Sequence, residues 1–218
     1  LERMTPSPDS LVHLTPADRG DSVAIRSTHP IGDILRFWSV ARSCRSPREC
    51  RGGRDAPEWP ESFATLWSRE LALAEAVSVE ETSSAQAAAP LQGTISRDAL
   101  SRRAEKLKRV VRFDIHLFTT RNVGAARLDR PNIQLRLADG RGNRYQPDSL
   151  HVAPPITTTL QPEGYNIFYR RNTVYFDRSA FKKPLEEFRP VRLWVIRTES
   201  QDLSYTWHID SPPQVSVR

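Results

Sequence analysis

The stretch Leu203-Ser204-Tyr205-Thr206-Trp207-His208-Ile209-Asp210 alternates strictly between apolar and polar residues. Successive side chains of a β-strand point to opposite faces, so this pattern predicts a strand with one face in a core and the other in water. The stretch 191–196 before it is apolar at nearly every position, which indicates a central strand. We expect these two strands to pair through the connection from Thr198 to Asp202.

Further strand patterns precede this pair. Apolar residues alternate with polar ones over 111–117 and again over 133–137, where the pattern runs into the stretch Ala138-Asp139-Gly140-Arg141-Gly142-Asn143. Asp-Gly and Gly-Asn pairs adopt the positive φ angles of tight hairpins, so this stretch predicts a hairpin. Arg170-Arg171-Asn172 lies between two more strand-like segments and predicts a second one. The chain is therefore expected to be mainly β, an immunoglobulin-like antiparallel β-sandwich over residues 65–218.

Helical spacing is found in fewer places. Ser96 as N-cap and Asp98 in the first turn predict one short helix, over 96–108, inserted in the sandwich. Residues 1–64 are expected to form a Pro- and Arg-rich arm with one or two helices. The first of these opens at Thr28 to Pro30 and ends near Arg42, and the second follows Pro60. The stretch 69–82 fits a helix or a strand, and its β-forming end favours the strand.

Bulk composition bounds the class of protein. The 218 residues suffice for one sizeable domain with an appendage, and 38% of them are hydrophobic, with a formal net charge of +6. A mean hydropathy of -0.54 is polar but not typical of a disordered chain. No stretch approaches the roughly 20 apolar residues of a membrane-spanning helix. The first residue is Leu1 and not Met, which favours a removed leader or a trimmed chain.

The two cysteines, Cys44 and Cys50, lie six positions apart around Pro47. Such a pair can close a small disulfide loop in an oxidising compartment, or remain as two free thiols. A zinc site requires four ligands, and no further His or Cys lies near them, so a metal is disfavoured. No cofactor is predicted.

Two clusters of basic residues are candidates for an anionic partner. In the arm, arginine recurs at every third position, and an extended backbone would bring these side chains onto one edge. The predicted helix at 96–108 carries a second cluster on its outer face. Both clusters are also compatible with ordinary solvated surface. The candidate residues are Arg42, Arg45, Arg48, Arg51, Arg54, Arg102, Arg103 and Lys106.

Catalytic motifs are missing from the sequence. It contains no phosphate-binding glycine loop before a helix and no Gly-x-Ser-x-Gly motif, and its five histidines lie far apart. Asp114 with His116, and His208 with Asp210, share strand faces and are the only candidates for an acid–base site. We therefore expect no catalytic or metal-binding residue and no enzymatic activity.

Residues 63–210 resemble uncharacterised bacterial cell-envelope proteins, many of them predicted lipoproteins. The resemblance lies in four motifs: Trp67-Ser68-Arg69-Glu70-Leu71, Phe113-Asp114-Ile115-His116-Leu117-Phe118, Ile133-Gln134-Leu135-Arg136-Leu137-Ala138-Asp139-Gly140 and Val174-Tyr175-Phe176-Asp177. It implies an envelope location and a β-sandwich, and it transfers no activity and no functional residue.

The function expected from the sequence is that of a non-catalytic cell-envelope protein that binds a protein partner or helps to assemble a complex. The alternative is binding of nucleic acid or another anionic polymer through the Arg-rich arm and the basic helix. The expected location is the periplasm or cell envelope, with the cytoplasm as the alternative. The sequence indicates no oligomeric state.

Overall fold

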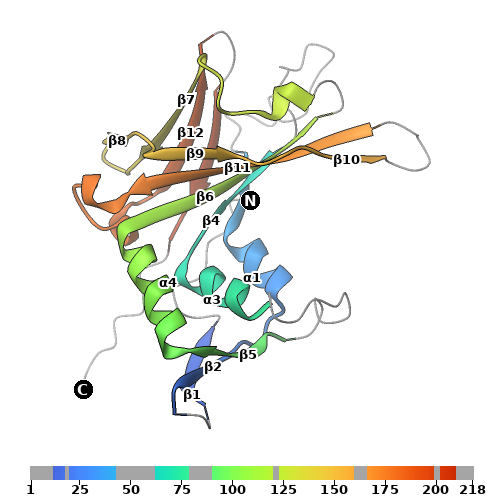
Figure 1. Cartoon of the computed structure of the whole chain (residues 1–218). Coiled ribbons are helices and arrows are strands. Elements are labelled where there is room, and N and C mark those ends of the chain that lie inside the picture. The colour runs from blue at the N-terminus through green and yellow to red at the C-terminus, as the bar shows by residue number, and fades with distance from the viewer. Residues whose placement is uncertain are drawn as a thin grey trace.

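The computed structural model describes residues 12–17, 20–42, 62–78, 90–119, 123–159, 166–198 and 202–209. Over these residues the chain is mainly β, and every strand pairing in its three sheets is antiparallel. Two of the sheets stack at the upper end of Figure 1, where their strands cross steeply. The helices lie below them, and the smallest sheet lies below the helices.

The largest sheet has six strands. In spatial order they are β10 (Ile156–Thr159), β11 (Asn166–Asp177), β6 (Val110–Thr119), β4 (Ser62–Leu66) and β3 (Ser39–Ala41), with β9 (Ser149–Val152) also paired to β11. The four-stranded sheet is ordered β13 (Leu203–Trp207), β12 (Val191–Arg197), β7 (Ile133–Ala138) and β8 (Arg144–Tyr145). Three short 3-10 helices connect strands: Val123–Ala126, Arg178–Ala180 and Leu185–Glu187.

The core lies between these two sheets. Alternate residues of β6 point inward, and Phe113, wholly buried, packs against Trp207 of the other sheet with 5.2 Å between ring centroids. Two hydrogen bonds also join β13 to β4 and to Trp38, the residue before β3. Tyr205 Oη donates to Ser62 Oγ at 2.8 Å, and Trp207 Nε1 donates to the Trp38 carbonyl at 3.0 Å. Polar atoms of the buried rings therefore retain partners inside the core.

A layer of helices covers the lower end of the six-stranded sheet (Figure 1). It contains α1 (Ile31–Phe37), α3 (Arg69–Ser78) and α4 (Arg97–Arg109). Glu70 of α3 is buried but accepts hydrogen bonds from Trp38 Nε1 at 3.2 Å and from the Val12 amide at 3.3 Å. The three-stranded sheet, ordered β1 (His13–Pro16), β2 (Ser22–Arg26) and β5 (Gln92–Ser96), lies beyond this layer.

Several predicted elements are confirmed. β12 and β13 pair antiparallel as expected, and β6 covers the alternating stretch at 111–117. The hairpin at 138–143 joins β7 to β8, and the Asp139 carboxylate accepts from the amides of Arg141 and Asn143. Gly142 has a positive φ of 85°. Gly140 has a different role, because a Cβ there would collide with the backbone carbonyl of Arg189.

Two local predictions are wrong. The expected strand at 69–82 is helix α3 over its described part, because its apolar residues satisfy the helical period when packed. Leu71, Leu73, Ala74 and Val77 are all buried. The helix expected after Pro60 is strand β4, whose backbone pairs with β3 on one side and β6 on the other. At 69–82 tertiary packing decided between two patterns that the sequence left close, whereas after Pro60 strand pairing prevailed over the predicted helical spacing.

The hairpin expected at Arg170-Arg171-Asn172 is also wrong, because β11 runs through these residues without a turn. Asn172 is fully buried in β11, and its side-chain amide forms hydrogen bonds with the backbone of another segment. Its Oδ1 accepts from the Leu128 amide at 3.2 Å, and its Nδ2 donates to the Ala126 carbonyl at 3.0 Å. A polar residue in this strand therefore anchors a neighbouring connection.

The first 64 residues contain more strand than expected. β1, β2, β3 and part of β4 lie in this region, and the predicted helix of 28–42 is confined to α1. The predicted boundary at 64/65 falls inside β4, which belongs to the same sheet as β6 and β11. Cys44, Cys50, Arg45, Arg48, Arg51 and Arg54 lie outside the described residues.

Candidate anion-binding groove

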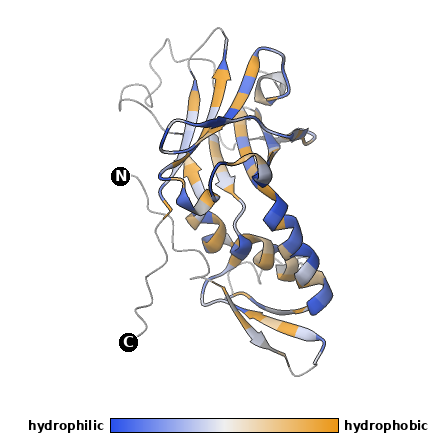
Figure 2. Cartoon of the chain, turned by 90° about the vertical axis from the view of Figure 1, so that its left-hand side faces the viewer, coloured by the Kyte–Doolittle hydropathy of each residue, from blue (hydrophilic) through white to orange (hydrophobic). Residues whose placement is uncertain are grey.

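Helix α4 concentrates the positive charge of the chain. Its thirteen residues include six basic and two acidic ones, a net +4, compared with +6 for all 218 residues. Its start is fixed by Ser96, whose Oγ accepts from the Ala99 amide at 3.2 Å, and strands β5 and β6 adjoin its two ends. None of its residues is buried, and Figure 2 shows a mostly hydrophilic helix. Its apolar side is half-buried, and Ala99 and Leu100 on that side pack against the core.

A cavity of about 350 Å³ lies between α3, α4 and the outer face of the six-stranded sheet. We call it the α4 groove. Its polar and aromatic lining consists of Trp67 after β4, Glu75 on α3, Arg102, Arg103 and Lys106 on α4, Arg112 on β6 and Tyr175 on β11. Residues three and four apart on a helix share a face, so the three basic residues of α4 reach the groove together. Tyr175 and Arg112 are direct partners in the register of β11 and β6.

The charges of the α4 groove are unevenly distributed. Within the part of the chain that the structure describes, Arg102, Arg103 and Lys106 form no ion pair, and the Lys106 ammonium lies 6.0 Å from the centre of the Tyr175 ring. Glu75 of α3 is the carboxylate in the lining. The groove therefore has a cationic side on α4 and an acidic residue on α3.

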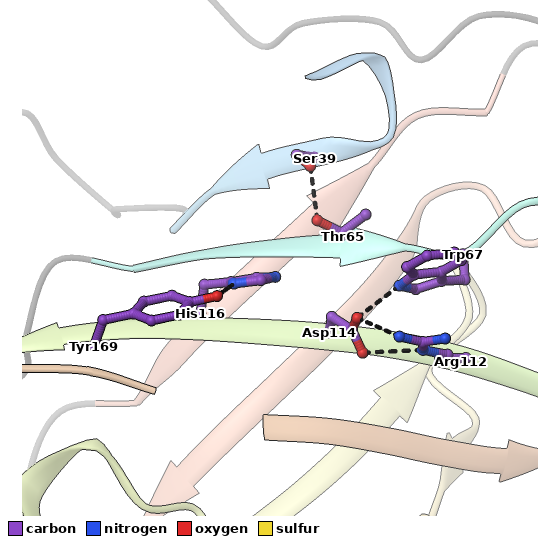
Figure 3. A network of polar contacts seen from close by, with 7 residues as sticks. All are labelled: Ser39, Thr65, Trp67, Arg112, Asp114, His116 and Tyr169. Carbon is purple, nitrogen blue, oxygen red and sulfur yellow. Dashed lines mark hydrogen bonds and ion pairs between the residues drawn. The ribbon is translucent and has the colours of Figure 1, made fainter. Parts of the chain in front are cut away.

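Arg112 is committed to a structural network (Figure 3). Its guanidinium donates to both Asp114 oxygens, at 3.1 and 2.7 Å, and stacks 3.8 Å from the centre of the Trp67 ring. Trp67 Nε1 donates to the same carboxylate at 2.8 Å. Burial lowers the pKa of Arg112, but the hydrogen bonds and charge of Asp114, with smaller effects of Tyr175 and Glu75, outweigh burial and raise the pKa. The network holds the Trp67 ring beside the groove.

His116 lies on the same sheet face as Asp114, as the sequence predicts, but the two do not form an acid–base pair. Its Nδ1 lies 2.6 Å from Tyr169 Oη, and its ring stacks on Phe63 with 4.3 Å between centroids (Figure 3). Burial lowers the pKa of His116 to about 4, against the opposing charge of Asp114. Both candidates have partners that fix them in the sheet. Of the other pair, Asp210 lies outside the described residues.

A second, more open hollow of about 560 Å³ adjoins the α4 groove and shares Arg102, Lys106 and Tyr175 with it. It adds Arg109 but also the carboxylates of Glu105 and Asp148. Glu105 pairs with Lys108 at 2.7 Å, on an exposed part of the helix. The charge around this hollow is mixed, so the stronger anion site is the α4 groove.

The predicted anion-binding residues separate into two groups. Arg102, Arg103 and Lys106 converge on one groove. Arg42 follows β3, and its amide donates to the Ser62 carbonyl at 3.4 Å, at the end of β4 opposite Trp67. Ser62 and Leu66 lie four positions apart along the strand, or roughly 13 Å, so Arg42 is not part of the groove.

Three residues of the groove have no distinguishing signal in the sequence. Trp67, Arg112 and Tyr175 are separated by tens of residues from one another, and sheet pairing brings them together. The Arg-rich stretch 42–54 contains no aromatic residue on which a base could stack. Beside α4, by contrast, Trp67 and Tyr175 come from distant parts of the sheet.

Comparison with known proteins gives no match to this chain, whether with family models, curated proteins or solved structures. In the ranges that the structure describes, no helix has the length and apolarity needed to cross a membrane. The same ranges contain no group of three or more His, Cys, Asp or Glu side chains placed to hold a metal ion.

Proposed function

We propose that this protein is a non-catalytic binding protein that engages an anionic partner through α4 and the α4 groove. The observation that carries the proposal is a helix of net charge +4 that buries no residue and directs Arg102, Arg103 and Lys106 around one cavity. The lining of this cavity also includes two aromatic residues, Trp67 and Tyr175, which distinguishes it from an ordinary solvated basic surface. The guanidinium group of arginine binds carboxylate and phosphate groups through paired hydrogen bonds, so either kind of anion suits the site.

Two partner classes meet this description: an acidic protein segment and a single-stranded nucleic acid. The protein partner is the function expected first from the sequence. The nucleic acid gains support from Trp67 and Tyr175, because single-strand sites combine cations with aromatic rings on which bases stack. Both depend on the same face of α4, and this shared dependence can be tested without knowing the natural partner.

The test measures fluorescence anisotropy of a labelled oligothymidylate and a labelled glutamate-rich peptide with the full chain. Two double variants are compared: Arg103→Gln with Lys106→Gln in the groove, and Arg97→Gln with Lys108→Gln on the opposite face of α4. Each removes one Arg and one Lys from the same helix, so their net charges are equal. We expect at least one probe to bind, with affinity falling as salt rises.

The groove variant should weaken this binding about tenfold, since the two lost contacts of these solvent-accessible side chains together contribute about 1.4 kcal/mol. The control variant should change it by less than about twofold, as expected for exposed charges away from a contact. Equal losses in both variants would show a diffuse positive field and not a site. No binding of either probe at low salt would remove the proposal.

We further propose an immunoglobulin-like arrangement for the two stacked sheets and a periplasmic or cell-envelope location. The first is supported by two antiparallel sheets with a shared aromatic core. The steep crossing of the strands in Figure 1 argues against it, so the crossing angle is the test: an experimental structure with about 30° would support the arrangement, and one near 90° would contradict it. The location rests on the resemblance of the four motifs, and fractionation of the source cells with an antibody tests it.

A further inference from the structure

The α4 groove has an apolar lining as well as cations. Ala72 of α3 and Ala99 and Leu107 of α4 form aliphatic walls, and the side chains of Trp67 and Tyr175 contribute aromatic surface. The two alanines are small, which leaves the space between the helices open. A volume of about 350 Å³ lies within the range of sites that enclose small organic molecules, roughly 300–1,000 Å³.

The charge distribution sets the orientation of a ligand. Its anionic group would meet the guanidinium groups of Arg102 and Arg103 and the Lys106 ammonium, one helical turn further along. On the opposite wall the charge of Glu75 acts on Arg112, which is already paired with Asp114, so the cations of α4 are the groups that meet the anionic group. The groove therefore suits a molecule with its negative charge at one end and an uncharged body at the other.

The uncharged body has aromatic partners. Arg112 stacks on the Trp67 ring, and Lys106 lies near the Tyr175 ring, so both rings contact cations that line the groove. A planar ring can pack against such a surface, as bases stack on aromatic side chains in nucleic-acid sites. An inorganic anion or a run of glutamates would leave this aromatic and aliphatic surface uncovered.

From this juxtaposition we infer that the α4 groove binds an aromatic organic anion. Its ring would lie between α3 and α4, and its anionic group would contact Arg102, Arg103 and Lys106. The inference rests on the proposed function and names the ligand class of the same site. A free aromatic acid and a nucleotide share this chemistry, and competition distinguishes them.

The probe is anilinonaphthalene sulfonate, an aromatic anion whose fluorescence rises in apolar surroundings. Phenylnaphthylamine is the same ring system without the sulfonate and serves as the neutral control. We expect saturable one-site binding of the anion, and binding of the neutral analogue weaker by about tenfold or more. Similar affinity for both would overturn the anionic part of the inference.

Two variants locate the probe. Ala72→Phe fills the groove and leaves every charge in place, so it should abolish the fluorescence response. The double variant at Arg103 and Lys106 should weaken binding about tenfold, whereas the double variant at Arg97 and Lys108 should not. If Ala72→Phe fails to fold, the charge variants still decide. Unchanged binding in the groove charge variant would place the probe elsewhere and overturn the inference.

Competition separates the ligand sources and the two proposals. Displacement of the probe by adenosine monophosphate, or by naphthoate alone, supports the inference and identifies the nucleotide or the free aromatic acid. Displacement by inorganic phosphate at the same concentrations would overturn the aromatic part and leave anion binding by α4 intact. Displacement by polyglutamate, with no effect of either aromatic anion, would overturn the inference in favour of an acidic protein partner.

Discussion

Lowering the pH should destabilise the fold through His116, which lies part-buried between β4 and β11. Its ring stacks on Phe63, and its Nδ1 lies 2.6 Å from Tyr169 Oη. Burial disfavours the charged imidazolium and lowers the pKa of His116 to about 4, and the positive charges of Arg171 and Arg112 act in the same direction. The unfolded chain binds the proton near the ordinary pKa of 6.5.

The sign of the effect follows from these two pKa values. Between about pH 6.5 and 4 the unfolded chain binds the proton and the folded chain does not, so stability falls as the pH drops through this window. Above the window both states are neutral, and below it both are charged. One pKa unit corresponds to about 1.4 kcal/mol, so His116 alone should lower the free energy of unfolding by about 2 kcal/mol between about pH 7 and pH 5.

Urea unfolding at these two pH values, followed by tryptophan fluorescence, measures the loss. His116→Gln is the matched variant, because glutamine cannot titrate but retains a hydrogen-bonding group toward Tyr169. Other titrating groups act equally in both proteins, so the difference between their pH dependences isolates His116. An equal loss of stability in the two proteins would refute the reasoning.

Three further predictions concern a close backbone approach, the N-cap of α4 and the core. Gly140→Ala should lower the free energy of unfolding by about 2 kcal/mol or more, because the added methyl group meets a backbone carbonyl, whereas Gly32→Ala in α1 has open space and should be neutral or stabilising. Ser96→Ala removes the N-cap of α4 and should cost about 1 kcal/mol in thermal unfolding, with a null result contradicting the cap. Phe113→Ala should cost about 3–5 kcal/mol in urea unfolding, and a loss below about 1 kcal/mol would mean that the sheets do not share this core.

The elements that were predicted correctly have signals that act locally. The alternation at 203–210 is too strict for a helix, and Ser96 begins α4 in the way that N-cap residues do. Asp139 organises its hairpin with bonds to residues two and four positions away. Each of these features depends on residues a few positions away in the chain, so the local sequence is sufficient to predict the element.

The incorrect predictions depend on distant contacts. The apolar positions of Arg69–Ser78 fit both periods until α1 and the sheets bury one helical face. Asn172 suggests a turn until the connection at 126–128 supplies partners for its amide. The α4 groove is of the same kind, since Trp67 and Tyr175 reach the basic helix only through the pairing of β4, β6 and β11.

The central claim is that one face of α4 forms an anion site. The most direct measurement is the ratio of the dissociation constants of the two double variants for the better-binding labelled polyanion, at one low salt concentration. The site predicts that loss of Arg103 and Lys106 weakens binding about tenfold while loss of Arg97 and Lys108 has little effect. A ratio near one would contradict it, because the charge of the helix would then act without regard to the groove.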